Sequence, residues 1–146
     1  MADRDERLRH HDLCFGCGQA NIFGLQLELE RRPEGGVAGR FFVKQDHQGP
    51  PGYAHCGVMA AALDEAMSLL LYGQGPFVLT GRLEVDLRAS APVGAFVALE
   101  ADVEGMEGQR FLVTASASDP DRPERVFATA RGTFVEADPQ EGSGGR

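Results

Sequence analysis

Two adjacent carboxylates interrupt the most apolar stretch of this 146-residue chain. Asp64 and Glu65 lie within residues 56–72, whose sequence CGVMAAALDEAMSLLLY predicts a helix that is apolar on every side. Buried carboxylates are costly unless they are paired, hydrogen-bonded or used in chemistry. We therefore predict that one of them works as a general base or a nucleophile. Asp64 is the first choice because its helical neighbours Ala60 and Ala61 offer no polar face, and Glu65 is the second.

The start of the predicted helix offers a second kind of chemistry. A Gly- and Pro-rich segment, residues 49–52, comes shortly before His55 and the apolar run. The first N–H groups of a helix lack partners within it and carry about half a positive charge. The N–H of Cys56 is therefore predicted to hold a carbonyl oxygen as that oxygen becomes negative. His55 either orients this loop or only caps the turn, and no His/Asp pair is placed to activate the Cys56 thiol as a nucleophile.

The separation of these two features predicts an assembly. His55 lies nine residues before Asp64, which is about 13 Å along a helix and on roughly opposite sides of it. One carbonyl group cannot contact both places in a single chain, so a site that uses both needs two subunits. A single sheet also covers only one side of a helix that is apolar all round. We therefore predict a homodimer or a dimer of dimers.

The elements that must position these residues follow from the turns along the chain. Alternating apolar segments bounded by Gly- and Pro-rich turns predict strands at residues 24–31, 37–44, 77–88, 95–103, 110–118 and 125–136. With the helix they give the order β-β-α-β-β-β-β, an α+β fold in which an antiparallel sheet wraps around one long central helix. Residues 13–136 are predicted to form this single domain, between a flexible arm at 1–12 and a disordered tail at 137–146.

A Cys14-x-x-Cys17 pair follows His10 and His11 near the N-terminus. These four side chains could hold zinc, but the second Cys or His pair usual in such sites is missing, and the two histidines are adjacent on a charged arm. A redox role lacks the βαβ context of a thioredoxin-like protein. We favour a Gly-supported turn that packs Phe15 and the cysteines against the domain, with no metal.

Composition limits the classes of function and partner. The net charge of −8, with one lysine among 14 basic residues, argues against a general nucleic-acid binder. No apolar run reaches the roughly 18–20 residues of a membrane span. The N-terminal sequence MADRDERLRHHD lacks the apolar region of a secretory signal. We predict a cytoplasmic protein whose partners include neither nucleic acid nor a membrane.

The element order, the His-x-Gly at the helix start and the acid within the helix resemble the hotdog-fold thioesterases. The branch that this pattern is most similar to is the phenylacetate-pathway and 4-hydroxybenzoyl-CoA type of acyl-CoA thioesterase. Its signature is His-Gly-Gly followed by an apolar helix with an Asp nine residues after the His. Here the signature reads His55-Cys56-Gly57 and then Asp64, so the resemblance implies that all four belong to the active site.

The resemblance extends from about residue 14 to residue 136. Residues 80–94 resemble the family's first strand after the helix, and residues 14–25 resemble a lead-in that a subset of hotdog proteins carries. There are two departures from the family pattern. Cys56 replaces the first Gly of His-Gly-Gly, which matters less if the backbone N–H does the work. Gly49 stands where the family often has an Asn, so this chain lacks that side chain.

The resemblance implies hydrolysis of acyl-CoA thioesters to a free acid and CoA, with no cofactor beyond the CoA of the substrate. In similar enzymes a hydroxyl near the start of the next strand supports the acid or its water, which points to Thr80. Arginines suit the phosphates of CoA, and Arg82 and Arg88 are the first candidates, followed by Arg110 and Arg131.

Two other functions stay open at the level of sequence. A non-catalytic protein that binds acyl thioesters would have the same scaffold. A hotdog dehydratase or hydratase would normally carry a His-Phe-Pro-Gly type loop, whereas here Pro50, Pro51 and Gly52 precede His55 and the spacing does not match.

Overall fold

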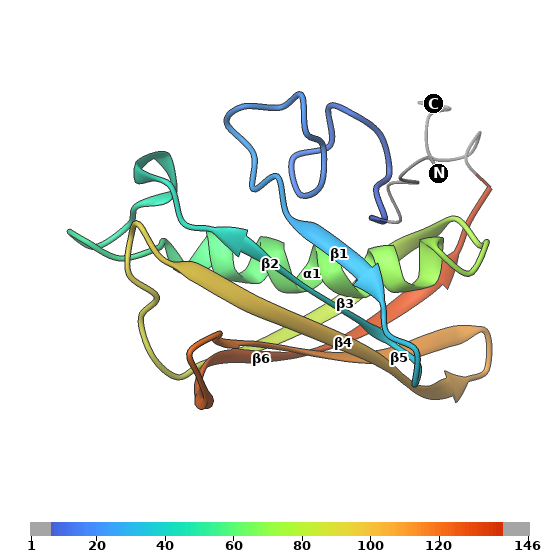
Figure 1. The fold of residues 1–146 in the computed structure, drawn as a ribbon. Coiled ribbons are helices and arrows are strands. Elements are labelled where there is room, and N and C mark those ends of the chain that lie inside the picture. Colours follow the sequence, from blue (N-terminus) through green and yellow to red (C-terminus); the bar gives the residue numbers. More distant parts are fainter. Residues whose placement is uncertain (1–6, 139–146) are drawn as a thin grey trace.

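A computed structural model describes residues 7–138 of the chain. The described elements are β1 (Glu28–Arg31), β2 (Val37–Phe42), the short 3-10 helix η1 (Gln45–His47), α1 (Cys56–Tyr72), β3 (Val78–Leu87), β4 (Phe96–Glu107), β5 (Arg110–Asp119) and β6 (Arg122–Glu136). Their order along the chain is the predicted β-β-α-β-β-β-β. Figure 1 shows α1 as the central helix, with the strands arranged around it.

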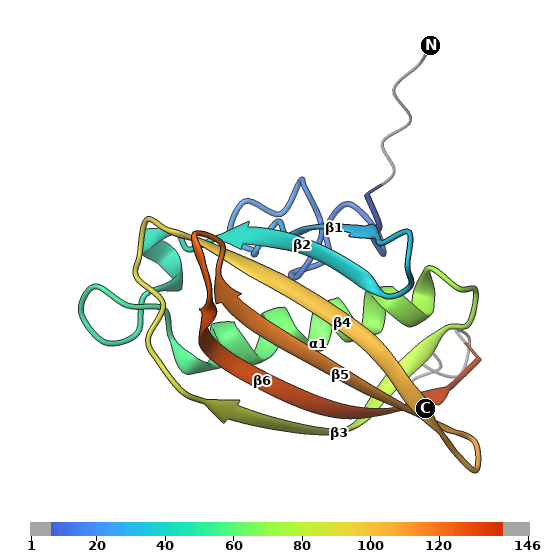
Figure 2. The same ribbon diagram turned by 60° about the horizontal axis from the view of Figure 1, so that its bottom comes forward.

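The six strands form one antiparallel sheet in the order β1-β2-β4-β5-β6-β3. The sheet curls around α1 (Figure 2), and the helix packs against the inner faces of β3, β4, β5 and β6. The largest fully buried side chains between helix and sheet include Leu63, Met67, Leu99 and Phe134. This arrangement confirms the predicted fold class, in which a sheet encloses one apolar helix.

The boundaries of α1 follow from its local sequence. His55 has an extended backbone and acts as the N-cap, and its side chain accepts a hydrogen bond from the Gly57 N–H. Residues 58–72 contain neither Gly nor Pro, so nothing interrupts the helix before Gly73. The Gly75 backbone then has φ +120°, a conformation that favours glycine, and Pro76 follows.

The segment before β1 packs across α1 on the side that the sheet leaves open (Figure 1). Leu25 donates its N–H to Phe15 O at 2.8 Å, Leu27 donates to Gly16 O at 3.0 Å, and both leucine side chains are buried. The predicted strand at 24–31 therefore begins only at Glu28, because the chain turns at Gln26 (φ +49°) and these amides pair with the preceding loop.

This segment also changes what was expected of the chain ends. Leu8 donates its N–H to Leu29 O at 2.8 Å, so part of the predicted arm at 1–12 is attached to the domain. Part of the cover that the sequence assigned to a second subunit comes from the chain itself. The Ala137 N–H donates to Phe77 O at 2.9 Å. The remaining parts of the predicted arm and tail, 1–6 and 139–146, lie outside the described residues.

Candidate active site

Asp64 and Thr80, the hydroxyl residue to which the family resemblance pointed, lie within hydrogen-bond distance of each other. Asp64 is half-buried in the third turn of α1, and Thr80 lies near the start of β3, 16 residues later. The Thr80 hydroxyl donates to Asp64 Oδ1 at 2.7 Å. A hydroxyl that holds one carboxylate oxygen fixes the orientation of the group and leaves the second oxygen free to act as a base or nucleophile.

A β-bulge in β3 aims Thr80 at the helix. Thr80 pairs with Phe134 and Arg82 pairs with Thr133, which leaves Gly81 as the extra residue between them. A bulge shifts the alternation of side chains along a strand and is common beside active sites. Thr80 therefore reaches Asp64, whereas Arg82 lies on the other face of the sheet, where it pairs with Glu84.

Burial raises the pKa of the Asp64 carboxyl above its usual range. The hydrogen bond from Thr80 acts in the opposite direction and offsets part of this shift, while the neighbouring charge of Glu65 adds to it. A higher pKa makes the ionised carboxylate a stronger base than an exposed aspartate. The surroundings of Asp64 therefore favour acid–base or nucleophilic work.

At the start of α1, three of the first four backbone N–H groups have hydrogen-bond acceptors. Val58 and Met59 donate to the His55 carbonyl oxygen, and the Gly57 N–H donates to His55 Nδ1 at 2.8 Å. Within residues 7–138, the Cys56 N–H has no acceptor, and Cys56 is exposed. His55 is thus the cap of the helix, and Cys56 rather than Gly57 carries the N–H available to a carbonyl oxygen.

The two halves of this candidate site are far apart in one chain. Cys56 is the first residue of α1 and Asp64 is the ninth, so about 12 Å of helix separates them. A single thioester carbonyl cannot contact the Cys56 N–H and the Asp64 carboxylate of the same subunit. In the structure, as in the sequence, the Cys56 N–H and the Asp64 carboxylate of one subunit are too far apart to act on the same carbonyl group.

Glu65, the second candidate acid, is turned away from Thr80. Its carboxylate is buried, and Oε2 lies 2.8 Å from His10 Nδ1 and 3.3 Å from Cys14 Sγ. Burial by itself would raise the pKa of Glu65, but hydrogen bonds from His10 and from the thiols of Cys17 and Cys14 outweigh burial and lower the pKa. Glu65 thus belongs to a different cluster, which the sequence did not connect to the helix.

The arginines proposed for CoA phosphates do not gather around Asp64. Arg82 pairs with Glu84 at 2.9 Å and Arg131 with Glu104 at 3.0 Å, and all four side chains are well exposed. Arg88 lines a groove of about 540 Å³ on the outer face of the sheet. The same groove is lined by the carboxylates of Glu84, Asp86, Glu100 and Asp102.

That excess of acidic groups makes the outer groove a poor site for a polyanion. Arg110 is placed differently from the other arginines. Its guanidinium lies beside Gly81, at the bulge that positions Thr80.

No helix within residues 7–138 is long and apolar enough to cross a membrane.

Comparison with protein families gives one match over half of the chain. Residues 51–126 match the model described as "Thioesterase superfamily". These residues include the helix start, all of α1 and the Thr80 bulge.

Curated relatives and solved structures agree with that match. The chain is 32% identical over 96 residues to acyl-coenzyme A thioesterase THEM5 of Mus musculus, a match that covers 66% of this chain and 38% of the mouse protein. It is 26% identical over 96 residues to acyl-coenzyme A thioesterase THEM4 of Bos taurus, covering 66% and 39%. The chain thus spans about two fifths of the length of these relatives.

Two crystal structures show the same fold. A thioesterase superfamily protein superposes with a TM-score of 0.74 at 24% identity, covering 81% of this chain and 60% of that one. A hypothetical thioesterase from Streptococcus pneumoniae TIGR4, solved with coenzyme A, superposes with a TM-score of 0.69 at 14% identity, covering 76% and 88%.

Proposed function

Because the chain belongs to the thioesterase superfamily, we propose that it hydrolyses acyl-CoA thioesters to a free acid and CoA. The observation that carries the proposal is the half-buried Asp64 carboxylate, held by Thr80 at 2.7 Å within the matched segment. Two further structures of the pneumococcal protein carry alanine in place of an aspartate and of a threonine. Those two positions are separated by the same interval as Asp64 and Thr80, which supports the choice of this pair.

The proposed reaction uses two groups of the protein. The Cys56 N–H polarises the thioester carbonyl and stabilises the negative charge that develops on its oxygen. Asp64 takes a proton from a water molecule whose oxygen attacks the carbonyl carbon. The intermediate collapses with cleavage of the C–S bond, and the proton passes from Asp64 to the sulfur of CoA. Direct attack by the Asp64 carboxylate is the other route, with water opening the resulting anhydride.

We propose that the two groups come from different subunits of a homodimer. On the free side of β3 no strand within residues 7–138 pairs with this ten-residue edge, and Leu79 and Leu87 are each 49% exposed. A long edge strand with exposed apolar side chains is a template for pairing with another chain. The partly exposed stripe of α1 at Ala61 and Asp64 continues this surface. Pairing along β3 would supply the partner that the 12 Å separation requires.

The activity is tested by measuring thiol release from short, medium-chain and aromatic acyl-CoAs. Release with one of these acyl groups is the expected result. Binding of acyl-CoA without release would favour the non-catalytic binding protein instead. Addition of water to an enoyl-CoA without loss of the thioester would favour the hydratase.

The predicted cytoplasmic location and the absence of any cofactor besides CoA stay predictions.

The role of the Cys56 N–H is separable from that of its thiol. Cys56→Pro removes the N–H at the first helical position, where proline is well tolerated, and the extended backbone of His55 suits a following proline. We expect kcat to fall by about 10²-fold, the usual effect of losing one oxyanion donor. Cys56→Ala keeps the N–H and is expected to keep the activity. Equal losses in both variants would instead implicate the thiol.

A mixed dimer tests the shared site. Asp64→Asn and Cys56→Pro chains are each expected to be nearly inactive as homodimers. In a mixed dimer one site combines both defects and the other combines both intact residues. Random exchange of the two chains should therefore restore about a quarter of the wild-type activity. No recovery in dimers proved to be mixed would show that each subunit uses only its own residues.

A further inference from the structure

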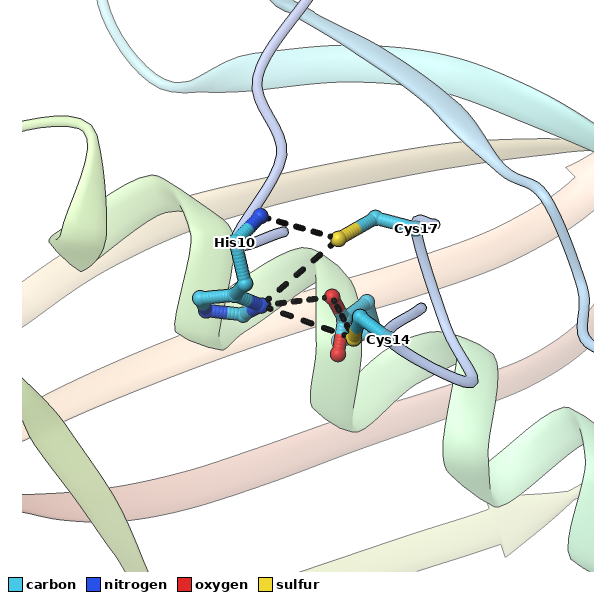
Figure 3. Close-up of side chains that lie close together, drawn as sticks. His10, Cys14 and Cys17 are labelled. Carbon is cyan, nitrogen blue, oxygen red and sulfur yellow. Dashed lines mark hydrogen bonds and ion pairs between the residues drawn. The ribbon is translucent and has the colours of Figure 1, made fainter. Parts of the chain in front are cut away.

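Four side chains with metal-binding atoms converge between the N-terminal segment and α1. His10, Cys14 and Cys17 come from the segment, as Figure 3 shows, and Glu65 comes from the helix. One ligand atom of each lies within 4.8 Å of all the others. Cys17 and Glu65 are buried, and His10 and Cys14 are half-buried. The cluster lies apart from the Asp64–Thr80 pair, and the proposed hydrolysis does not use it.

The spacing of these atoms is close to that of a tetrahedral zinc site. Zinc bonds of about 2.0–2.3 Å at tetrahedral angles place neighbouring ligand atoms about 3.3–3.8 Å apart. His10 Nδ1 lies 3.8 Å from Cys14 Sγ and 3.7 Å from Cys17 Sγ, and Cys14 Sγ lies 3.3 Å from Glu65 Oε2. The 2.8 Å between His10 Nδ1 and Glu65 Oε2 is the hydrogen bond that an ion would replace. Only small movements are needed to seat the ion.

The backbone of the cysteine loop is shaped for this approach. A side chain at Gly16 would overlap the Glu65 carboxyl group, and one at Gly18 would overlap the backbone of Asp12 and Cys14. Gly18 also donates its N–H to Cys14 O at 2.8 Å, which closes the turn between the two cysteines. The glycines therefore let the loop lie directly on the helix at Glu65.

Groups around the cluster suit bound thiolates and a bound imidazole. The backbone N–H of His10 donates to Cys17 Sγ at 3.0 Å, a contact that stabilises negative charge on sulfur. Ser68 Oγ lies 3.2 Å from His10 Nε2, so the hydroxyl can accept a hydrogen bond from the ring Nε2–H when Nδ1 binds a metal. Such outer partners orient metal-ligating histidines and are part of well-built sites.

We propose that His10, Cys14, Cys17 and Glu65 bind one zinc ion in a closed structural site. Thiolates, imidazoles and carboxylates are the ligands of zinc in tetrahedral protein sites. Four protein ligands leave no coordination position for water or substrate. The thiols give up their protons to solvent when the ion binds. The ion would clamp the N-terminal segment onto α1, one residue from Asp64.

A zinc site here replaces the metal-free turn that the sequence favoured, and its ligands differ from the four side chains that the sequence offered. The sequence paired the cysteines with both histidines, but His11 is exposed and its ring accepts a hydrogen bond from the Leu13 N–H. The missing fourth ligand is Glu65, which lies 51 residues after Cys14.

The test uses the full chain with any affinity tag removed, kept reduced and stripped with a chelator. Titration with Zn²⁺ against a coloured competitor should give one ion per chain. Titration with Co²⁺ should give the strong visible bands of a tetrahedral ion together with thiolate-to-cobalt charge transfer. Cys17→Ser and His10→Ala should weaken binding by at least about 10²-fold, and Ser68→Ala by about tenfold. The matched control His11→Ala should bind as the wild type does.

Two results would overturn the site: no stoichiometric binding by the wild type, or binding that survives the double replacement of Cys14 and Cys17 by serine. A measurement on the wild type alone covers the case in which variants fail to fold. Alkylation mapped by mass spectrometry should show Cys14 protected by Zn²⁺ at least about tenfold. Exposed Cys56 should react equally with and without the ion and serves as the internal control. Equal reactivity of Cys14 in both states contradicts the proposal.

Discussion

Asp64 and Glu65 are consecutive residues of one helix, yet they have opposite surroundings. A rotation of about 100° between neighbours points Asp64 toward β3 and Glu65 toward the N-terminal segment. Asp64 is half-buried and receives a hydrogen bond from Thr80. Glu65 is buried and is contacted by His10 and Cys14. Two neighbouring carboxyl groups of one helix are therefore stabilised by different hydrogen-bond partners.

The hydrogen-bond donors around a carboxylate can have a larger effect on its pKa than burial has. Burial acts on both side chains in the same direction. One hydroxyl offsets it only in part at Asp64, whose pKa is raised. The His10 and thiol donors more than offset it at Glu65, whose pKa is lowered. A carboxylate that is so well satisfied makes a good anchor and a poor base, whereas Asp64 stays basic.

The largest expected effect separates the two carboxylates by activity. Asp64→Asn should lower kcat for thioester hydrolysis by about 10³-fold, because an amide neither accepts the proton nor attacks the carbonyl. Thiol release at saturating acyl-CoA measures it, with circular dichroism as the check on folding. Asp86→Asn, the same change on the outer face of β3, is the matched control. A greater loss in folded Glu65→Gln than in Asp64→Asn would reverse the assignment.

The next effect concerns stability. In the metal-free protein, Glu65→Gln should lower the free energy of unfolding at pH 7 by about 1–3 kcal/mol, because hydrogen bonds to a buried charge are lost. A carboxyl whose folded-state pKa is lowered contributes stability above its unfolded-state pKa. The gap between wild type and variant should therefore shrink as the pH falls through the folded-state pKa. Urea unfolding in chelator at several pH values measures it, and a gap that does not change with pH contradicts the account.

Thr80 gives the third comparison. Thr80→Val keeps the shape but removes the donor to Asp64, and kcat/KM should fall about tenfold, the equivalent of one hydrogen bond to a charge. Since that hydrogen bond lowers the Asp64 pKa, its loss should move the acid limb of the pH–rate profile to higher pH. Thr80→Ser should restore both the rate and the profile. An equal loss in Thr80→Ser, which keeps the hydroxyl, would mean that the hydrogen bond alone does not explain the effect.

The smallest effect has the opposite sign to that of Glu65. A carboxyl with a raised folded-state pKa costs stability when it is ionised, so Asp64→Asn should stabilise the protein at pH 7. We expect a gain below about 1 kcal/mol, because the half-exposed side chain is screened by solvent. The gain should shrink as the pH falls below the folded-state pKa and vanish below the unfolded-state pKa, where the carboxyl is protonated in both states. Chemical unfolding measures it, and destabilisation by Asp64→Asn would show that Asp64 is held by more than Thr80.

Much of the candidate site could be predicted because it depends on local sequence. The cap at His55 and the apolar run fix α1, and Thr80 follows at the start of the next strand. The position of Arg82 could not be predicted because the bulge at Gly81 changes which residues of β3 face the helix. The strand at 24–31 was too long because the turn at Gln26 depends on contacts with the preceding loop.

The sequence by itself determined the order of the elements, the limits of α1 and the presence of two carboxylates in its middle. These follow from caps, turns and the spacing of apolar residues, which act over a few positions. Only the tertiary structure decided that Asp64 meets Thr80 and that Glu65 meets His10 and the cysteines. The rotation of a helix about its axis is set by packing against the rest of the chain, and an all-apolar helix leaves that rotation open in its own sequence.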